Sequence, residues 1–240
     1  MKIRVGMENN IEGRSLAWAV DHPGCFAYGP DGKSAIVNMA QAIPAYIRWM
    51  EHHTPDAWFQ PEAINIDLVD VWDCYTIDDN YARAAQGYEV NAWFLTDWVP
   101  LSAQDVEHGL QLLSWSRTDL LLLVSDLTEA HLDQERLGER WSIRGILKHV
   151  ATAEWWYLDR LGCADQNREN LANDAFERLE AQRNRLQAVL PELVGVERVV
   201  GVDGEFWSPR KLMRRSVWHE MDHFQHIQRL LLEGARRPQK

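Results

Sequence analysis

The chain has 240 residues, of which 46% are hydrophobic, and a formal net charge of −11 at pH 7. Because this acidic balance lacks the basic surface of a protein that binds a phosphate backbone, we expect neither nucleic acid nor an anionic membrane as a partner. Cys25, Cys74 and Cys163 are odd in number and far apart in sequence, which indicates a reducing, cytoplasmic location without a disulfide framework.

The first 99 residues mix strand and helix patterns. Ile3, Val5 and Met7 alternate with polar or small residues, as in a half-buried strand. The expected elements in chain order are strands over residues 3–7, 14–20 and 25–28, a helix over 34–50, and strands over 64–68 and 88–98. Pro44 lies inside the expected helix and should kink it or leave one of its hydrogen bonds unmade.

Residues Gly13–Met50 resemble the small HicB-type domain. The resemblance rests on the order strand-strand-strand-helix-strand and on the stretch P-G-C-x-A-x-G, which is Pro23–Gly29, before the helix. HicB-like antitoxins often carry a separate DNA-binding tail, and no segment here matches one, so the resemblance implies a binding or packing module. The alternative is a small α/β appendage that stabilises the C-terminal domain.

Beyond Pro100 the sequence predicts helices, in an antiparallel four-helix bundle. Ser102, Ser142 and Ser208 each precede a helical pattern and are typical N-cap residues. The expected helices are residues 102–125, 142–160, 168–190 and 208–233, with a turn or short hairpin over 195–204 and a stop at Gly234. The fold class is therefore α+β, with an N-terminal α/β module over residues 1–99 and the bundle over 100–240.

The last expected helix places three histidines on one face. His219 and His223 are four residues apart, and His226 follows three residues later. At 3.6 residues per turn the three histidines lie above one another over two turns of the helix. The other residues of that face are mainly apolar, so we expect it to point into the bundle. Core histidines with locally satisfied ring nitrogens are one interpretation. The other is a metal site, since two imidazoles one turn apart can hold one ion.

Two metalloenzyme patterns fit this helix poorly. His219-Glu220-Met221-Asp222-His223 satisfies H-E-x-x-H, the zinc-protease pattern in which the glutamate is the general base. In the longer version of that pattern, Arg229 stands where the third histidine should be. A di-iron carboxylate site needs a second Glu-x-x-His, which the chain does not contain. Glu220 and Asp222 are more simply solvated charges, or hydrogen-bond partners of a ligand imidazole.

The second expected helix supplies a candidate third ligand. His149 shares a stripe with Ile146 and Val150, so we expect it to point into the bundle. Three neutral imidazoles leave one to three positions open on a metal ion, as in catalytic sites. Their affinity for metal should fall as they protonate near pH 6.

Residues 102–232 resemble the DinB/YfiT-like family. The matching pieces are W-S-I-R-x-x-L-x-H at Trp141–His149, F-W-S-P-R at Phe206–Arg210, and H-E-M-D-H-F-Q at His219–Gln225. The resemblance implies that one divalent ion (zinc, nickel or iron) is bound by His149, His219 and His223. Family members with known activity are metal-dependent transferases or isomerases that use a low-molecular-weight thiol, and relatives are often dimers.

The resemblance implies a homodimeric, divalent-metal-dependent transferase that acts on a small-molecule substrate and uses a low-molecular-weight thiol as a cofactor. The alternative is a non-catalytic metal-binding stress or interaction protein whose N-terminal module binds a partner. No catalytic residue beyond the ligands is identified. Aromatic side chains near the ligands in sequence are candidates for a substrate cavity, or are simply core: Trp155, Trp156, Tyr157, Trp207 and Trp218.

Overall fold

The computed structural model describes the backbone of residues 2–236 and the side chains of residues 2–233. Internal contacts divide the chain into two compact units, one made of Met1–Leu101 with Val196–Arg214 and the other of Ser102–Gly195 with Arg215–Lys240. A domain boundary after residue 99 stays a prediction. The division by contacts differs from it because it groups residues 196–214 with the N-terminal part.

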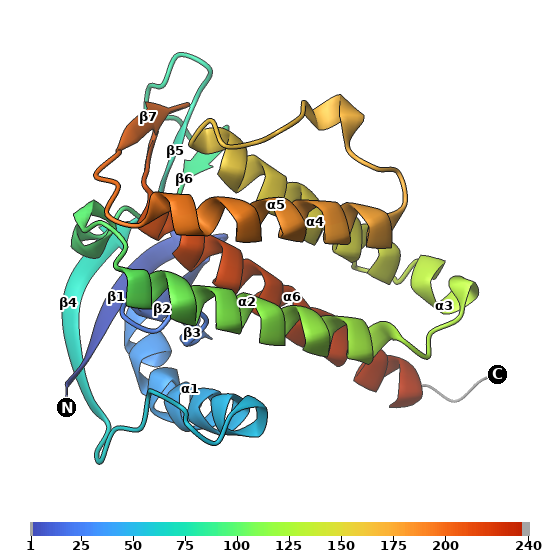
Figure 1. Cartoon of the computed structure of the whole chain (residues 1–240), viewed down its shortest axis with the longest axis horizontal. Helices are drawn as coiled ribbons and strands as arrows, with labels where there is room; N and C mark the ends of the chain where they lie inside the picture. Colours follow the sequence, from blue (N-terminus) through green and yellow to red (C-terminus); the bar gives the residue numbers. More distant parts are fainter. Residues whose placement is uncertain (1, 237–240) are drawn as a thin grey trace. The chain divides into compact units, whose positions relative to one another are not determined.

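The first unit is built on a four-stranded sheet in the order β3-β2-β1-β4 (Figure 1). Its strands are β1 (Lys2–Ile11), β2 (Arg14–Ala19), β3 (Phe26–Gly29) and β4 (Asn65–Asp73). Helix α1 (Gly32–His53) begins after Asp31, whose carboxylate accepts a hydrogen bond from the Ser34 backbone N–H at 2.8 Å. The expected order of elements is confirmed, and α1 continues through Pro44 as one helix.

The parallel pairing of β1 with the edge strand β4 contains one irregularity. Val5 pairs with Leu68 and Gly6 pairs with Asp70, so Val69 has no partner in the register. An extra residue of this kind bends the strand and increases its twist. Strand β4 has nine residues, more than the five predicted from the alternation at 64–68.

The rest of the first unit consists of short elements. They are β5 (Tyr75–Ile77), β6 (Tyr88–Val90), the 3-10 helix η1 (Leu95–Trp98), β7 (Val200–Val202) and β8 (Glu205–Trp207). The strand predicted over 88–98 was wrong beyond Val90, because the Asp97 carboxylate accepts a hydrogen bond from the Phe94 N–H at 2.9 Å and begins a helical turn. The predicted hairpin is confirmed as β7–β8, whose Asp203-Gly204 turn has φ values of 50° and 80°.

The second unit contains four long helices, α2 (Ala103–Val124), α4 (Ile143–Arg160), α5 (Ala175–Val189) and most of α6 (Pro209–Arg236). Shorter elements are α3 (Glu129–Asp133), η2 (Arg168–Asn170) and η3 (Leu190–Leu193). Ser102, Ser142 and Ser208 each accept a hydrogen bond from a backbone N–H of the following turn, as predicted for N-caps.

Two predicted helix ends were wrong. α5 begins at Ala175 instead of Arg168, because the Asp174 carboxylate accepts hydrogen bonds from the Phe176 and Glu177 N–H groups at 2.8 and 3.0 Å. α6 does not stop at Gly234 and runs to Arg236. A glycine lowers helix propensity by about 1 kcal/mol relative to alanine, which is too little to end a long helix by itself.

All four long helices contribute to one apolar core. Its buried members are Leu120, Val124, Leu132, Ile143, Ile146, Leu147, Val150, Ala151, Ala175, Leu179, Ile227 and Leu230. This shared core makes the second unit a four-helix bundle, with His149 on α4 and His219 and His223 on α6 along its interior stripes.

Four buried charges also join the helices of the bundle. Arg117 on α2 donates from Nε to Glu220 Oε2 on α6 at 2.7 Å and from Nη1 to the Leu179 carbonyl on α5 at 2.6 Å. Arg183 on α5 donates from Nη2 to Glu220 Oε1 at 2.9 Å, and from Nε to Glu154 Oε1 on α4 at 3.0 Å. Two guanidinium groups and two carboxylates therefore balance one another inside the bundle.

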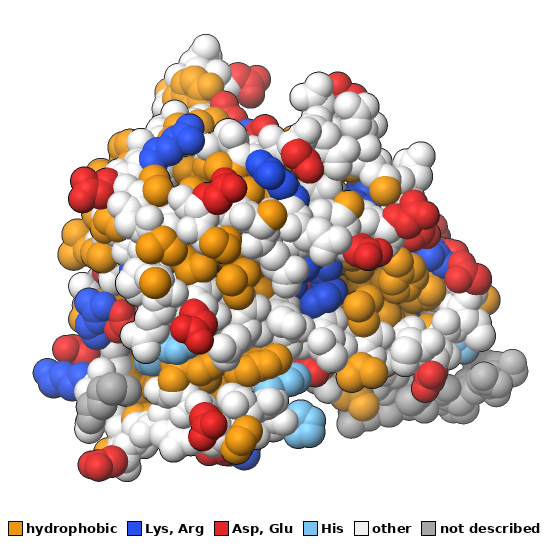
Figure 2. Space-filling view, in the orientation of Figure 1, with side chains coloured by type: hydrophobic (Ala, Val, Ile, Leu, Met, Phe, Trp, Pro, Cys, Tyr) orange, Lys and Arg blue, Asp and Glu red, His pale blue; other side chains and the backbone are white. Residues whose placement is uncertain are grey.

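The surface carries charges of both signs. On the face drawn in Figure 2, Lys and Arg side chains are scattered among Asp and Glu side chains and do not form one basic field. Within the part of the chain that the structure describes, no helix combines the length and the apolar character needed to cross a bilayer.

Candidate metal centre

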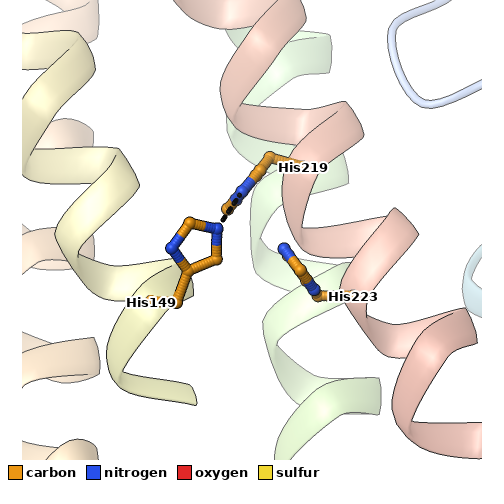
Figure 3. A group of neighbouring side chains, drawn as sticks. All are labelled: His149, His219 and His223. Carbon is orange, nitrogen blue, oxygen red and sulfur yellow. Dashed lines mark hydrogen bonds between the residues drawn. The ribbon is translucent and has the colours of Figure 1, made fainter. Parts of the chain in front are cut away.

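His149, His219 and His223 converge in the bundle (Figure 3). Their candidate ligand nitrogens all lie within 4.8 Å of one another, and His149 Nε2 lies 3.1 Å from His219 Nε2. The ring centres are 4.9 Å apart for His149 and His219, 5.0 Å for His149 and His223, and 4.5 Å for His219 and His223. The structure thus brings together the three residues that the sequence singled out.

The segment before α4 fixes the ring of His149. The Trp141 ring stacks on the His149 ring with centres 4.5 Å apart and an interplanar angle of 23°. Gly145, one turn before His149, makes this possible because a Cβ at that position would lie 2.9 Å from Trp141 Cβ. The missing side chain at Gly145 therefore leaves room for the indole of Trp141 to lie against the imidazole of His149.

Burial keeps the three imidazoles neutral. Desolvation, followed by the charge of Arg140, lowers the pKa of His149 to about 4. Desolvation, followed by His149 and His226, lowers the pKa of His223 to about 3. Desolvation also lowers the pKa of His219 well below its usual value. At neutral pH each ring therefore has one nitrogen lone pair available for a metal ion or for a hydrogen-bond donor.

This donor set fits a divalent transition-metal ion. Imidazole nitrogens bind zinc at about 2.0–2.1 Å, which puts two ligands of a tetrahedral site about 3.3 Å apart. The 3.1 Å between His149 Nε2 and His219 Nε2 is close to that spacing. In Figure 3 the nitrogen at the tip of the His223 ring lies on the side of the other two histidines.

His226 is held away from the other three rings. Its Nε2 lies 2.8 Å from Glu139 Oε2, and its ring centre is 5.9 Å from that of His223. The carboxylate of Glu139, on the loop before α4, thus binds the His226 nitrogen that could otherwise serve as a fourth metal ligand. Three imidazoles without His226 leave room for further ligands on an ion.

Glu220 takes neither of the roles that the sequence suggested. Its side chain is fully buried, so it is not a solvated helix charge. Ser116 Oγ donates to its Oε1 at 2.5 Å, and Arg117 and Arg183 occupy the rest of the carboxylate. The glutamate of the H-E-x-x-H pattern is therefore committed to the bundle core and is not placed as the general base of a protease.

Two of the five aromatic residues named from the sequence lie near His219, and a substrate cavity lined by them stays a prediction. The Tyr157 and Trp218 rings lie 6.0 and 5.8 Å from the His219 ring. Trp155 donates from Nε1 to the Gln166 carbonyl, and Trp207 belongs to the first unit. Trp156 packs edge-on against Tyr157. Trp141, which the sequence marked only as part of a motif, makes the closest aromatic contact with the three histidines.

Comparison with known proteins found a family model that matches much of the bundle. The model of the DinB superfamily matches residues 112–227, which include all three histidines. A solved structure, YfiT from Bacillus subtilis, described as a probable metal-dependent hydrolase with an unusual four-helix bundle topology, is similar with 19% sequence identity and a TM-score of 0.46. That similarity covers 56% of this chain and 90% of YfiT. No curated protein matches the chain.

Proposed function

We propose that His149, His219 and His223 bind one divalent metal ion, and that the protein is a metal-dependent transferase acting with a low-molecular-weight thiol. The observation that carries the proposal is the set of three neutral, converging imidazoles from which His226 is held away by Glu139. A structural site is usually closed by four protein ligands, whereas a catalytic site keeps a position open.

A divalent ion at such a site supplies Lewis acidity, which lowers the pKa of a thiol that reaches an open position. The chain's own residues hold the ligand geometry and shield it from water. Trp141 keeps the His149 ring in place, and the rings of Tyr157 and Trp218 give apolar surface next to His219. The part of the chain that the structure describes offers no cysteine nucleophile beside the imidazoles, since Cys163 lies beyond the end of α4.

The proposed reaction is a substitution at carbon by sulfur. The thiol loses its proton to solvent, and a lone pair of the sulfur forms a new bond to an electrophilic carbon of the second substrate. The leaving group departs with the electron pair of the bond that breaks. No residue of the protein is consumed or oxidised.

A panel of thiols and electrophiles, assayed with metal-loaded protein, tests the transferase. We expect turnover that disappears in His223→Ala and persists in His52→Ala, a matched control on the exposed end of α1. Elemental analysis of protein without a His-tag identifies the ion, since imidazole suits zinc, nickel and iron alike. Metal binding without turnover for any thiol would contradict the transferase and leave the metal site standing.

The second candidate is a metal-binding interaction protein with a HicB-like first unit. One observation favours it. Trp98 and Phe206 are 52% and 50% exposed, and both pack against Trp93 with ring centres 4.9 and 5.7 Å from it. Exposed aromatic groups of this kind often mark binding surfaces. Loss of a stable complex in Trp98→Ala, with no thiol turnover in the parent protein, would favour this candidate.

A further inference from the structure

The loop between α3 and α4 reaches the histidines of the bundle at two points. Trp141 stacks on the His149 ring, with ring centres 4.5 Å apart. Two residues earlier in the chain, Glu139 Oε2 lies 2.8 Å from His226 Nε2. One loop therefore contacts a proposed metal ligand and also the histidine of α6 that follows the other two ligands.

His226 lies close to the proposed metal site without belonging to it. Its ring centre is 5.9 Å from that of His223, whereas the ring centres of the three proposed ligands are 4.5 to 5.0 Å apart. Among the described side chains, the group of ligand atoms within 4.8 Å of one another contains no nitrogen of His226. Because residues three apart on a helix are neighbours on one face, a rotation of this side chain could bring its ring toward the ion.

The backbone of the loop holds Glu139 in position. The Glu139 N–H donates to the Arg136 carbonyl at 3.0 Å and closes a tight turn. Gly138 lies inside that turn with a φ of 88°, a conformation that favours glycine. The Arg136 side chain donates to the backbone carbonyl and the side-chain oxygen of Gln134. The neighbouring cation of the turn is thus bound to Gln134, and the carboxylate of Glu139 binds His226.

The hydrogen bond between Glu139 and His226 opposes rotation of the ring toward the ion. Only 21% of the His226 side chain and 25% of the Glu139 side chain are exposed. A hydrogen bond to a carboxylate is roughly twice as strong as one between neutral groups, and partial burial limits the competition from water. Rotation of the ring has to break this bond, so a chain without the carboxylate loses the main obstacle to that rotation.

We propose that Glu139 is a positioning residue that keeps a coordination position open by holding His226 away from the ion, and that His226 becomes a fourth protein ligand when this carboxylate is removed. The inference rests on the proposed function, of which it uses the metal site alone. Three protein ligands are typical of catalytic zinc sites, and four are typical of structural ones. A single carboxylate outside the ligand set would thus decide whether a small molecule can reach the ion.

Azide, a small anion that binds open positions of metal ions, tests the inference on cobalt-loaded protein. The visible absorption of cobalt reports the binding of both metal and azide, so no turnover is needed. We expect Glu139→Ala to bind cobalt more tightly and azide more weakly than the parent protein, each by about tenfold or more, the lower end of what a group outside the ligand shell is worth. Glu139→Gln should behave as the parent protein does, because its amide oxygen still accepts the hydrogen bond from His226.

A double variant shows whether the effect passes through His226. In Glu139→Ala combined with His226→Ala, the azide affinity should return to that of the parent protein, because no fourth ring is left to fill the open position. Glu135→Ala is the matched control, since Glu135 is an exposed carboxylate on the same loop. Its cobalt and azide affinities should equal those of the parent protein.

Three results would overturn the inference. One is an azide affinity that is unchanged in Glu139→Ala, or a loss that persists in the double variant. Another is weaker cobalt binding in both Glu139→Ala and His226→Ala, which would make His226 a ligand oriented by Glu139. The third is a parent protein that binds cobalt but no azide, since its site would have no open position.

None of these measurements uses a thiol, so they separate the inference from the proposed transferase. Absence of turnover with every thiol contradicts the transferase and leaves the role of Glu139 intact. Turnover together with an unchanged azide affinity in Glu139→Ala contradicts only the role of Glu139. A parent protein that binds no cobalt contradicts the metal site and, with it, both proposals.

Discussion

Glu220 directly follows His219 in α6, yet the two side chains reach different neighbours. Glu220 Oε2 accepts from Arg117 Nε at 2.7 Å, whereas His219 Nε2 lies 3.1 Å from His149 Nε2. One turn of α6 therefore serves two buried polar clusters, the charged one that joins the four helices and the neutral one proposed to bind metal. The predictions below test these clusters separately.

The three imidazoles should account for all tightly bound metal. His149→Ala together with His219→Ala should lower the affinity by more than about 100-fold, the upper end of what changes outside the ligand shell cost. His226→Ala should keep one ion per chain, because Glu139 already engages that ring. Elemental analysis after dialysis measures both. Stoichiometric metal in the double variant would show that the ion binds elsewhere.

Metal affinity should change little between pH 7 and pH 5. The sequence alone suggested a loss near pH 6, but desolvation lowers the pKa of His149 to about 4 and that of His223 to about 3. Because the pKa values in the folded state are lowered, the rings stay neutral until the pH falls well below the pKa of a free imidazole. Protons then compete with the ion only below about pH 4–5. Competition with a coloured chelator measures the profile, and a tenfold loss between pH 7 and 6 would contradict it.

Removing one partner of the buried charge cluster should be costly. Glu220→Gln leaves Arg117 and Arg183 without one of their two carboxylates, and we expect the free energy of unfolding to fall by about 3–5 kcal/mol. Arg144→Gln is the matched control, since its partners Glu129 and Asp133 are 84% and 57% exposed. Breaking that surface pair should cost less than about 1 kcal/mol. Urea unfolding followed by circular dichroism compares the two, and equal losses would refute a special role for the core cluster.

The homodimer stays a prediction, supported by one surface feature. Leu121 and Leu122 are adjacent on α2, and their side chains are 41% and 67% exposed. Two neighbouring exposed leucines on a bundle helix indicate a surface that a partner could cover. We expect a mass of twice 27.9 kDa by light scattering, and a monomer in Leu122→Glu. A monomer of the parent protein at high concentration would remove the dimer.

Much of the fold was predictable because local signals agreed with it. The serines before α2, α4 and α6 act as caps, and the histidine spacing on α6 placed two imidazoles on one face. Asp174 was missed although Glu177 follows it three residues later, which is a capping signal. The pairing of Arg117 and Arg183 with Glu154 and Glu220 was out of reach, because it joins four helices across 29 to 103 residues of sequence. From the sequence alone, a charged residue is predicted to be exposed to solvent unless its ion-pair partner is known.

The irregularity at Val69 has a consequence for handling the protein at high concentration. Strand β4 forms an edge of its sheet and exposes Leu68, Val69 and Val71. A regular edge strand of this kind could pair with a strand of another molecule. The unpaired residue breaks the alternation halfway along the strand. An incoming strand can then match the hydrogen-bonding pattern on one side of Val69 but not continue it on the other. We therefore expect the same irregularity that interrupts the ladder with β1 to hinder the stacking of molecules into fibres.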